Sequence, residues 1–246
     1  MDNPNLAEGW VAVSGKATLR KDLGVLNNAT DILNSPNLKA AGLDRDALQR
    51  IVEVQKNLDS AAPDFKELLE NIVAAEKFAD RPGFDKVLSS LQNTAAKGAP
   101  LIGANYTLKF LKEKGGNITA IKFEEKILDG ARIVDMTGKV NGKDIFFEFK
   151  SVKDLPPGDF GKQFTNDLIN SDSLEQIKWV FDSTKVDASK LAANKSSLLN
   201  QLEKSLETLS QRELEGMAFK YGVQKPTVAE ITKVVSDNFE KIFGVF

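Results

Sequence analysis

Cysteine and histidine are both absent from the 246 residues of this chain. Without cysteine the chain forms no disulfide bond, offers no thiol nucleophile and builds no thiolate zinc site. Without histidine it has no imidazole general base, no Ser-His-Asp triad and no HNH-type nuclease centre. Any catalysis must therefore use carboxylates, lysine, arginine, tyrosine, hydroxyls or amides. Oxygen ligands of this kind favour Mg²⁺ or Mn²⁺ over zinc.

Long apolar runs and strongly basic blocks are also lacking. Hydrophobic residues make up 41% of the chain and charged residues 28%, which is typical of a globular protein. No run approaches the roughly 20 apolar residues that cross a bilayer, and no basic-then-apolar leader opens the chain, so we expect neither a membrane span nor a secretory leader. The formal net charge of −2 argues against non-specific coating of DNA. It leaves room for a local basic groove beside a metal.

Helical patterns dominate both ends of the chain. Apolar residues recur with a 3.6-residue period within residues 1–98, which predicts a helical N-terminal module. Residues 187–246 are expected to form a C-terminal helical extension that packs on the core and includes a last helix from Pro226 through Phe243. This extension carries a leucine stripe, at Leu198, Leu202, Leu206 and Leu209. Core packing is the simpler interpretation of the stripe, and a partner helix is the alternative.

The central segment, residues 99–186, mixes helical and strand patterns. The sequence predicts a helix from Ala104 to Lys114, a strand over residues 118–127, a β-hairpin, a loop, and an amphipathic helix over about residues 173–181. This order predicts an α+β fold, in which a small mixed β-sheet lies between helical flanks.

The hairpin is the most informative part of this segment. Asn141 and Gly142 join two strand-like runs and suit a type I′ turn, because both residue types tolerate positive φ. If these two are the loop residues, Val140 pairs with Lys143, and the register of the whole hairpin follows. Side chains alternate across a strand, so one face of the hairpin becomes a core face, made of Val134, Met136, Ile145, Phe147 and Phe149.

The other face of the hairpin gathers charged side chains. In this register Asp135 lies directly opposite Glu148, Ile133 lies opposite Lys150, and the two acids share a face with Lys150. Two carboxylates roughly 5 Å apart repel each other and cost stability unless a cation neutralises them. Phe146 lies among these polar residues, where a purely solvated face would not need an aromatic ring. A divalent cation is therefore the expected occupant.

Asp135, followed by Glu148-Phe149-Lys150, resembles the catalytic core of the PD-(D/E)XK nuclease superfamily. The resemblance implies a restriction-endonuclease-like core in which Asp135 and Glu148 hold Mg²⁺ or Mn²⁺. The metal would polarise the scissile phosphate and lower the pKa of a bound water. Lys150 would favour hydroxide and neutralise charge on the phosphorane, and the Phe149 carbonyl is a natural additional metal ligand.

The same superfamily adds a further acid from the preceding helix or strand. The candidates are Glu113, Glu124 and Glu125, and we favour Glu124 as a fourth catalytic residue, although each taken singly is more simply a surface acid. A glutamine and an aromatic residue on a later helix support substrate binding in some relatives. Gln176 and Lys178 are the candidates for that role here, but their spacing departs from the QxxxY pattern.

A broader resemblance covers about residues 123–181, which look like the C-terminal nuclease tips of bacterial polymorphic toxins of the Rhs and contact-dependent inhibition types. Trp10 and residues 19–22 and 34–38 look like the lead-in to such tips. The resemblance implies a toxic DNase domain of a larger toxin, secreted or delivered into a target bacterial cell and active in its cytoplasm. It also implies a cognate immunity protein, whose acidic surface would mimic the phosphate backbone.

Two alternatives stay open. One is a tRNA- or RNA-cleaving toxin of the same fold, because the preference for DNA rests on the resemblance alone. The other is a non-catalytic helical interaction module, in which the acidic face of the sheet is solvated and Lys150 only offsets Asp135 and Glu148. An acid-x-Lys pattern on a strand arises by chance in many proteins. Metal-dependent cleavage of nucleic acid therefore distinguishes a nuclease from a non-catalytic interaction module.

Overall fold

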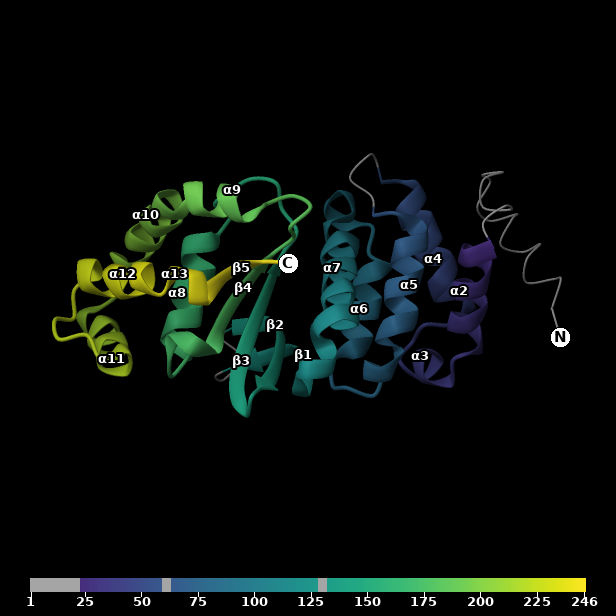
Figure 1. Ribbon diagram of the computed structural model, residues 1–246, viewed down its shortest axis with the longest axis horizontal. Coiled ribbons are helices and arrows are strands. Elements are labelled where there is room, and N and C mark those ends of the chain that lie inside the picture. Colours follow the sequence, from purple (N-terminus) through teal and green to yellow (C-terminus); the bar gives the residue numbers. More distant parts are fainter. Residues whose placement is uncertain (1–22, 59–62, 128–131) are drawn as a thin grey trace. The chain divides into compact units, whose positions relative to one another are not determined.

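The protein is described by a computed structural model, which covers residues 23–58, 63–127 and 132–246 (Figure 1). The chain divides into two units, Met1–Asn117 and Ile118–Phe246. Trp10 and residues 19–22, which carry part of the resemblance to toxin lead-in segments, lie outside the described residues. In the described part of the chain, no helix is both long and apolar enough to cross a membrane.

The first unit is helical, as the apolar period predicted. Its described helices are α2 (Leu23–Asn34), α3 (Pro36–Ala40), α4 (Arg45–Lys56), α5 (Phe65–Ala75), α6 (Phe84–Leu91) and α7 (Ala99–Lys114), with short 3₁₀ turns η2 (Glu76–Phe78), η3 (Ala95–Gly98) and η4 (Gly115–Asn117). Side-chain oxygens of Ser35, Asp44 and Asp64 cap the starts of α3, α4 and α5. The unit extends beyond the expected boundary at residue 98, because α7 packs against α5 and α6.

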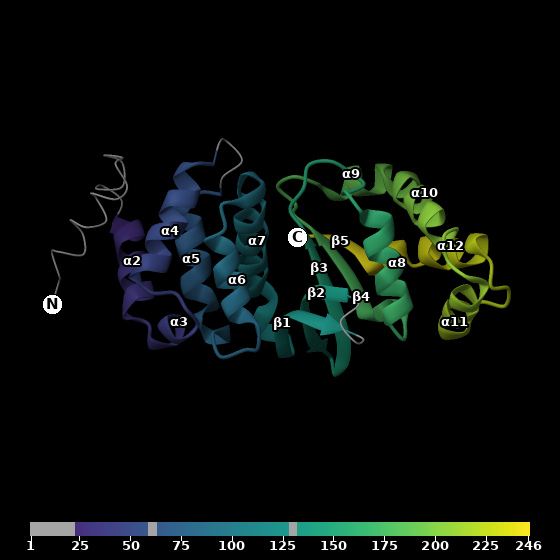
Figure 2. The same ribbon diagram turned by 180° about the vertical axis from the view of Figure 1, so that it is seen from behind.

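The second unit combines a five-stranded sheet with helices, so the α+β fold class is confirmed. Its elements are β1 (Thr119–Ile127), β2 (Arg132–Val140), β3 (Lys143–Lys150), α8 (Phe160–Asn170), η5 (Leu174–Gln176), β4 (Ile177–Phe181), α9 (Ala188–Ala193), α10 (Lys195–Leu206), α11 (Gln211–Tyr221), α12 (Val228–Asp237), α13 (Phe239–Ile242) and β5 (Phe243–Val245). The strands lie in sequence order. β1, β2 and β3 run antiparallel, whereas β4 and β5 continue the sheet in parallel (Figure 2).

The hairpin register is confirmed over the part nearest the turn. Asn141 and Gly142 have φ values of 51° and 78°, which the sequence anticipated for this turn. The β2–β3 pairing runs from Val140 opposite Lys143 to Met136 opposite Phe147. The expected pairs of Asp135 with Glu148 and of Ile133 with Lys150 lie beyond this ladder. The predicted core face is buried, namely Val134, Met136, Ile145, Phe147 and Phe149.

Beyond this ladder each strand keeps the neighbour on its other side. β2 continues along β1 as far as Arg132 opposite Ile127, whereas β3 continues along β4 as far as Lys150 opposite Phe181. The sheet is therefore opened between β2 and β3 at the level of Asp135. This opening, rather than a continuous hairpin, frames the charged residues.

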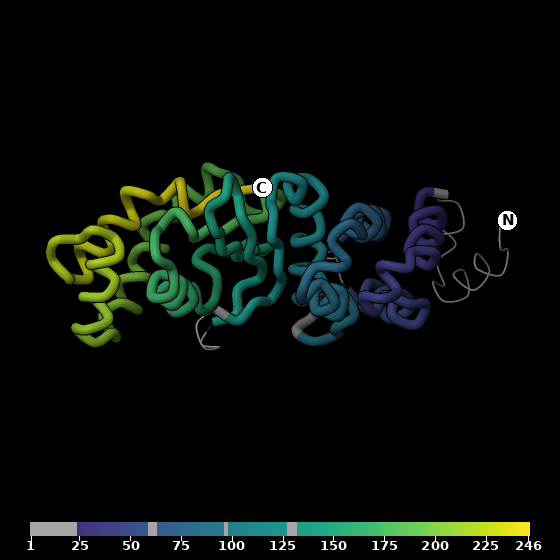
Figure 3. The backbone as a smooth tube through the Cα atoms, turned by 90° about the horizontal axis from the view of Figure 1, so that it is seen from below, coloured from purple at the N-terminus to yellow at the C-terminus, as the bar shows by residue number. Residues whose placement is uncertain are grey.

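The expected helix over residues 173–181 is wrong. Its second half is strand β4, in which Ile177, Trp179 and Phe181 are buried on alternate positions. A period of two with aromatic and β-branched residues is a strand pattern, whereas the spacing of Leu174, Ile177 and Phe181 alone suggests a helical stripe. The helix of this region is α8, which lies in the stretch between the hairpin and residue 173 where the sequence predicts a loop. Figure 3 follows the backbone from the first three strands through α8 to β4.

The C-terminal region is helical, as expected, with one difference. The helix expected from Pro226 through Phe243 is interrupted at Asn238, and the chain then ends in β5, which pairs with β4. Leu198, Leu202 and Leu206 of the leucine stripe are buried, which confirms core packing. They belong to the hydrophobic core in which α10 packs against α8.

An aromatic cluster fixes α8 on the sheet. The rings of Phe160 and Phe164 on α8 lie edge-on to the Trp179 ring of β4, at centroid distances of 5.1 and 5.8 Å, and Phe243 of β5 joins them. Edge-to-face pairs of this kind add about 0.5–1.5 kcal/mol each beyond the area they bury. The cluster thereby holds the polar side of α8 against the sheet face that carries Glu148.

Candidate active site

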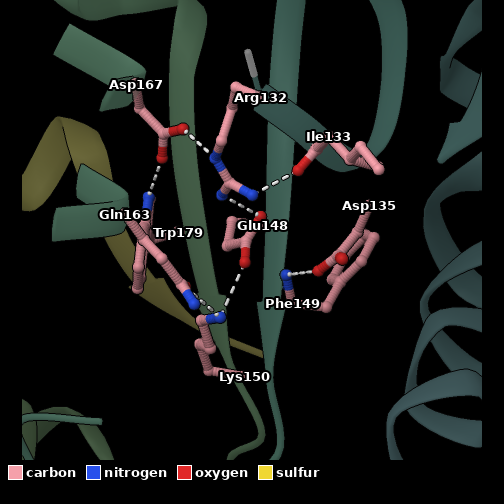
Figure 4. Close-up of polar contacts among 9 residues, drawn as sticks. All are labelled: Arg132, Ile133, Asp135, Glu148, Phe149, Lys150, Gln163, Asp167 and Trp179. Atoms are coloured by element: carbon pink, nitrogen blue, oxygen red, sulfur yellow. Dashed lines mark hydrogen bonds and ion pairs between the residues drawn. The ribbon is translucent and has the colours of Figure 1, made fainter. Parts of the chain in front are cut away.

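Glu148 lies at the centre of a network of charged side chains (Figure 4). It is 5% exposed, and its neighbour on β4 is Trp179, so it points toward the sheet face covered by α8. One carboxylate oxygen, Oε1, accepts from Lys150 Nζ at 2.6 Å, and the other, Oε2, accepts from Arg132 Nη2 at 2.6 Å. Two cations therefore neutralise a buried acid.

Lys150 is held by three groups from three elements. Besides its ion pair with Glu148, its Nζ donates to Gln163 Oε1 of α8 at 2.9 Å and lies 4.8 Å from the centre of the Trp179 ring. Its position two residues after Glu148 places both side chains on one face of β3. The ammonium is thus fixed in position, and its side chain is 15% exposed.

Arg132 connects Glu148 to a second buried acid on α8. Its Nε donates to Asp167 Oδ1 at 2.8 Å, and its Nη1 donates to the Ile133 carbonyl. Trp179 Nε1 donates to the other Asp167 oxygen at 2.8 Å. Asp167 is 2% exposed, so these contacts supply both of its oxygens with partners where water has little access.

Asp135 lies on the other flank of β3 and is held by the backbone. Its Oδ2 accepts the Phe149 N–H at 2.7 Å. The pKa of Asp135 is raised to about 7, mainly by burial and also by the negative charge of Glu148. The Phe149 N–H, Lys150 and Arg132 oppose this shift. The repulsion from Glu148 has the sign expected for two acids placed near each other.

Burial and ion pairing compete elsewhere in the network. Burial raises the pKa of Asp167 to about 6, although Arg132 pulls it down. Burial alone would lower the pKa of Arg132, but Glu148 and Asp167 outweigh it, and the pKa is raised. Arg132 therefore stays charged and holds two acids at once.

The structure brings together three of the residues singled out from the sequence: Asp135, Glu148 and Lys150. Glu124 lies on β1 with a φ of 43°, between neighbours that pair with Met136 and Val134, so it is level with Asp135. Its role as a further catalytic acid stays a prediction.

The two candidates for substrate binding lie outside the network. The Gln176 side chain accepts the backbone N–H groups of Asp172 and Ser173 and thereby caps η5. Lys178 is the neighbour of Phe147 on the opposite sheet face, and its Nζ donates to the Lys241 carbonyl. Alternation along β4, which had been expected to be a helix, explains why Lys178 does not share a face with Trp179.

Sequence reasoning missed Arg132, Gln163 and Asp167 as members of the site. Gln163 and Asp167 are four residues apart on α8 and therefore share a helix face, which is the signal that recognition of this helix would have exposed. Arg132 was not among the candidate residues. Nothing in its local sequence indicated that it would bridge two acids from β3 and α8.

Two acids near Lys150 are the candidate ligands for a divalent cation. The described residues contain no group of three or more acidic side chains that could hold a metal ion. Asp135 and Glu148 nevertheless offer the hard carboxylate oxygens that Mg²⁺ prefers. Glu148 already gives one oxygen to each of two cations, so Mg²⁺ would replace one of these contacts. The donor chemistry fits a divalent cation held by two carboxylates and completed by water.

Comparisons with known proteins add no family to this description. Protein-family models, curated protein sequences and solved structures were all compared with the chain. None gave a significant match. The site must be interpreted from its own geometry.

Proposed function

We propose that residues 118–246 form a Mg²⁺- or Mn²⁺-dependent nuclease that hydrolyses phosphodiester bonds, with DNA as the substrate. The observation that carries the proposal is Lys150, whose ammonium is fixed between Glu148 and Gln163. A carboxylate pair with a fixed ammonium beside it offers a place for a cation and for a negatively charged substrate.

Each group has a task in this proposal. A metal held by Asp135 and Glu148 would supply a polarised phosphate and an activated water. Lys150 stabilises negative charge that develops on the phosphate, and Gln163 together with the Trp179 ring keeps its ammonium in place. The Phe149 N–H orients Asp135 from a rigid strand. Glu124 is proposed as an additional acid because it is level with Asp135 on β1.

The biological setting rests on the resemblance of residues 123–181 to polymorphic-toxin nuclease tips. We propose on this basis a toxin domain that is delivered into a target bacterium, acts in its cytoplasm and is neutralised by a cognate immunity protein. An RNA-cleaving toxin, with tRNA as substrate, is the alternative within the same chemistry.

One observation favours a second, non-catalytic function. Both oxygens of Glu148 and both oxygens of Asp167 already have partners, so the network is largely satisfied without a metal. A network of this kind can simply specify how α8 docks on the sheet in an interaction module.

A cleavage assay separates the two functions. Supercoiled plasmid and total tRNA are incubated with the whole protein in Mg²⁺ or in EDTA. The nuclease predicts Mg²⁺-dependent cleavage that is lost in Asp135→Ala and Lys150→Ala and kept in Lys143→Ala, a control on the same hairpin whose partner Glu175 is exposed. Preference for plasmid or tRNA identifies the substrate. If neither is cleaved by folded wild-type protein, the interaction module stands.

A further inference from the structure

The two ends of the Arg132 guanidinium contact acids with different roles. Its Nε is paired with Asp167 at 2.8 Å, and Asp167 is itself fixed by the Trp179 N–H. Neither of these partners belongs to the proposed metal site. By contrast, its Nη2 contacts Glu148, which is one of the two proposed metal ligands.

The two ends should respond differently when a cation binds Glu148. A cation there competes with Nη2 for the same carboxylate, but it leaves the pair of Nε with Asp167 intact. Because the guanidinium is planar and its N–H groups form a fixed fork, the freed Nη2 remains beside the site. The Nη2 group then has an unused donor at the place where a substrate phosphate would approach.

The charges of the network point in the same direction. When ionised, Asp135, Glu148 and Asp167 exceed Arg132 and Lys150 by one negative charge. A divalent cation reverses that sign, so an anionic phosphate is repelled before the cation binds and attracted afterwards. Arginine suits such a partner, since its fork matches two phosphate oxygens.

We propose that Arg132 is a phosphate-binding residue whose guanidinium is paired with Glu148 until a divalent cation binds that carboxylate. Asp167 is the positioning residue that then keeps Arg132 at the site. This inference rests on the proposed function and extends it, because it makes binding of the substrate backbone depend on prior binding of the cation.

Salt dependence of DNA binding tests the role of Arg132 directly. A short DNA duplex is bound at several KCl concentrations, in Ca²⁺ and in EDTA, by wild-type protein and by Arg132→Met. Loss of one phosphate contact lowers the slope of log K against log salt by about 0.9. We expect this reduction in Ca²⁺ and equal slopes in EDTA, where Glu148 holds the guanidinium. Equal slopes in Ca²⁺, or the same reduction in EDTA, would overturn the inference.

The matched control is Lys139→Met, which removes a cation from the same strand. Lys139 pairs with exposed Asp144 at 3.1 Å. The slope of log K against log salt for Lys139→Met should equal that of wild-type protein in both buffers. Where Arg132→Met does not fold, Arg132→Lys replaces it. An ammonium lacks the fork, so the gain in DNA affinity on adding Ca²⁺ should fall several-fold, and an undiminished gain contradicts the role of Arg132.

A measurement without DNA tests whether Arg132 is paired with Glu148 before the cation binds. Mg²⁺ is titrated while the melting temperature is followed. Removal of the competing guanidinium in Arg132→Met should lower the half-saturating Mg²⁺ concentration several-fold. An unchanged concentration would contradict competition between Arg132 and the cation for Glu148. If wild-type protein shows neither cleavage nor stabilisation by Mg²⁺, the proposed nuclease itself fails. If wild-type protein shows both and Arg132→Met has the same salt slopes, only the role of Arg132 fails.

Discussion

Asp135 accepts the backbone N–H of Phe149 through its side chain, at 2.7 Å. A carboxylate therefore stands where a backbone carbonyl of β2 would continue the antiparallel ladder with β3. The ladder between β2 and β3 ends at Met136 and Phe147, beyond which β2 still pairs with β1 and β3 with β4. This contact holds Asp135 in the vicinity of Glu148, whereas burial and the charge of Glu148 make Asp135 costly to ionise there.

Asp135→Asn should raise the melting temperature in metal-free buffer at pH 7 and above. The amide oxygen can still accept the Phe149 N–H, while the repulsion from Glu148 is removed. The pKa of Asp135 is raised to about 7, so between about pH 4 and pH 7 the folded protein retains a proton that the unfolded chain has released. Stability from this group is present at low pH and is lost as the pH rises toward 7.

The difference in melting temperature between Asp135→Asn and wild-type protein should therefore be small near pH 4 and grow up to about pH 7. Mg²⁺ should stabilise wild-type protein more than the variant. Asp144→Asn, which changes an exposed acid on the same hairpin, serves as the control. A variant less stable than wild-type protein at pH 8 would count against the proposed repulsion.

Lys150→Met should lower the cleavage rate by about 10²–10³-fold, the usual effect of removing one preorganised stabilising group from an active site. The fold should survive, because Arg132 still neutralises Glu148. Single-turnover cleavage and circular dichroism measure the two effects. Lys143→Met on the same strand should cleave at the wild-type rate, and a matching loss there would remove the special role of Lys150.

Trp179→Phe should destabilise the protein by about 1–3 kcal/mol, because it leaves one oxygen of buried Asp167 without a donor. Urea denaturation gives this free energy. The same substitution made in an Asp167→Asn background should cost less, since the charged acceptor is already gone. Equal costs in the two backgrounds would show that the loss comes from ring packing instead.

Gly161→Ala should destabilise the protein by about 1–3 kcal/mol through overpacking between α8 and α10. A Cβ atom at Gly161 would lie 2.5 Å from the Gln201 backbone oxygen. Gly216→Ala in α11 is the matched control, because a Cβ atom there meets nothing within 4 Å. This control should stabilise the protein by about 0.5–1 kcal/mol, since alanine favours helix interiors. Thermal denaturation of both variants shows whether stability falls in Gly161→Ala and rises in Gly216→Ala.

Local signals in the sequence predicted much of the hairpin. The turn residues Asn141 and Gly142 set the register, and alternation separated the apolar face from Glu148 and Lys150. These signals act between neighbours in the ladder, so they extend only as far as the ladder does. Nothing local showed that β2 would leave β3 after Met136.

The remaining parts of the site depend on contacts across the fold. Arg132 meets Asp167 only because α8 crosses over the sheet before β4 pairs with β3. The helix α8 was missed, and β4 was mistaken for a helix, so Gln163 had no predicted place beside Lys150. Short apolar runs do not distinguish a buried strand from a helix by periodicity alone.

The network is also compact along the chain. Its side-chain partners are separated by between 2 and 35 residues, and all of them lie between Arg132 and Trp179. Closing such short loops costs little entropy, so the charged groups can meet before the last helices dock. Substitutions in α9–α13 should consequently reach the chemistry only indirectly, through their packing against α8 and against the aromatic cluster around Trp179. Evolution could thus remodel the C-terminal helices extensively while leaving the arrangement of acids and cations intact.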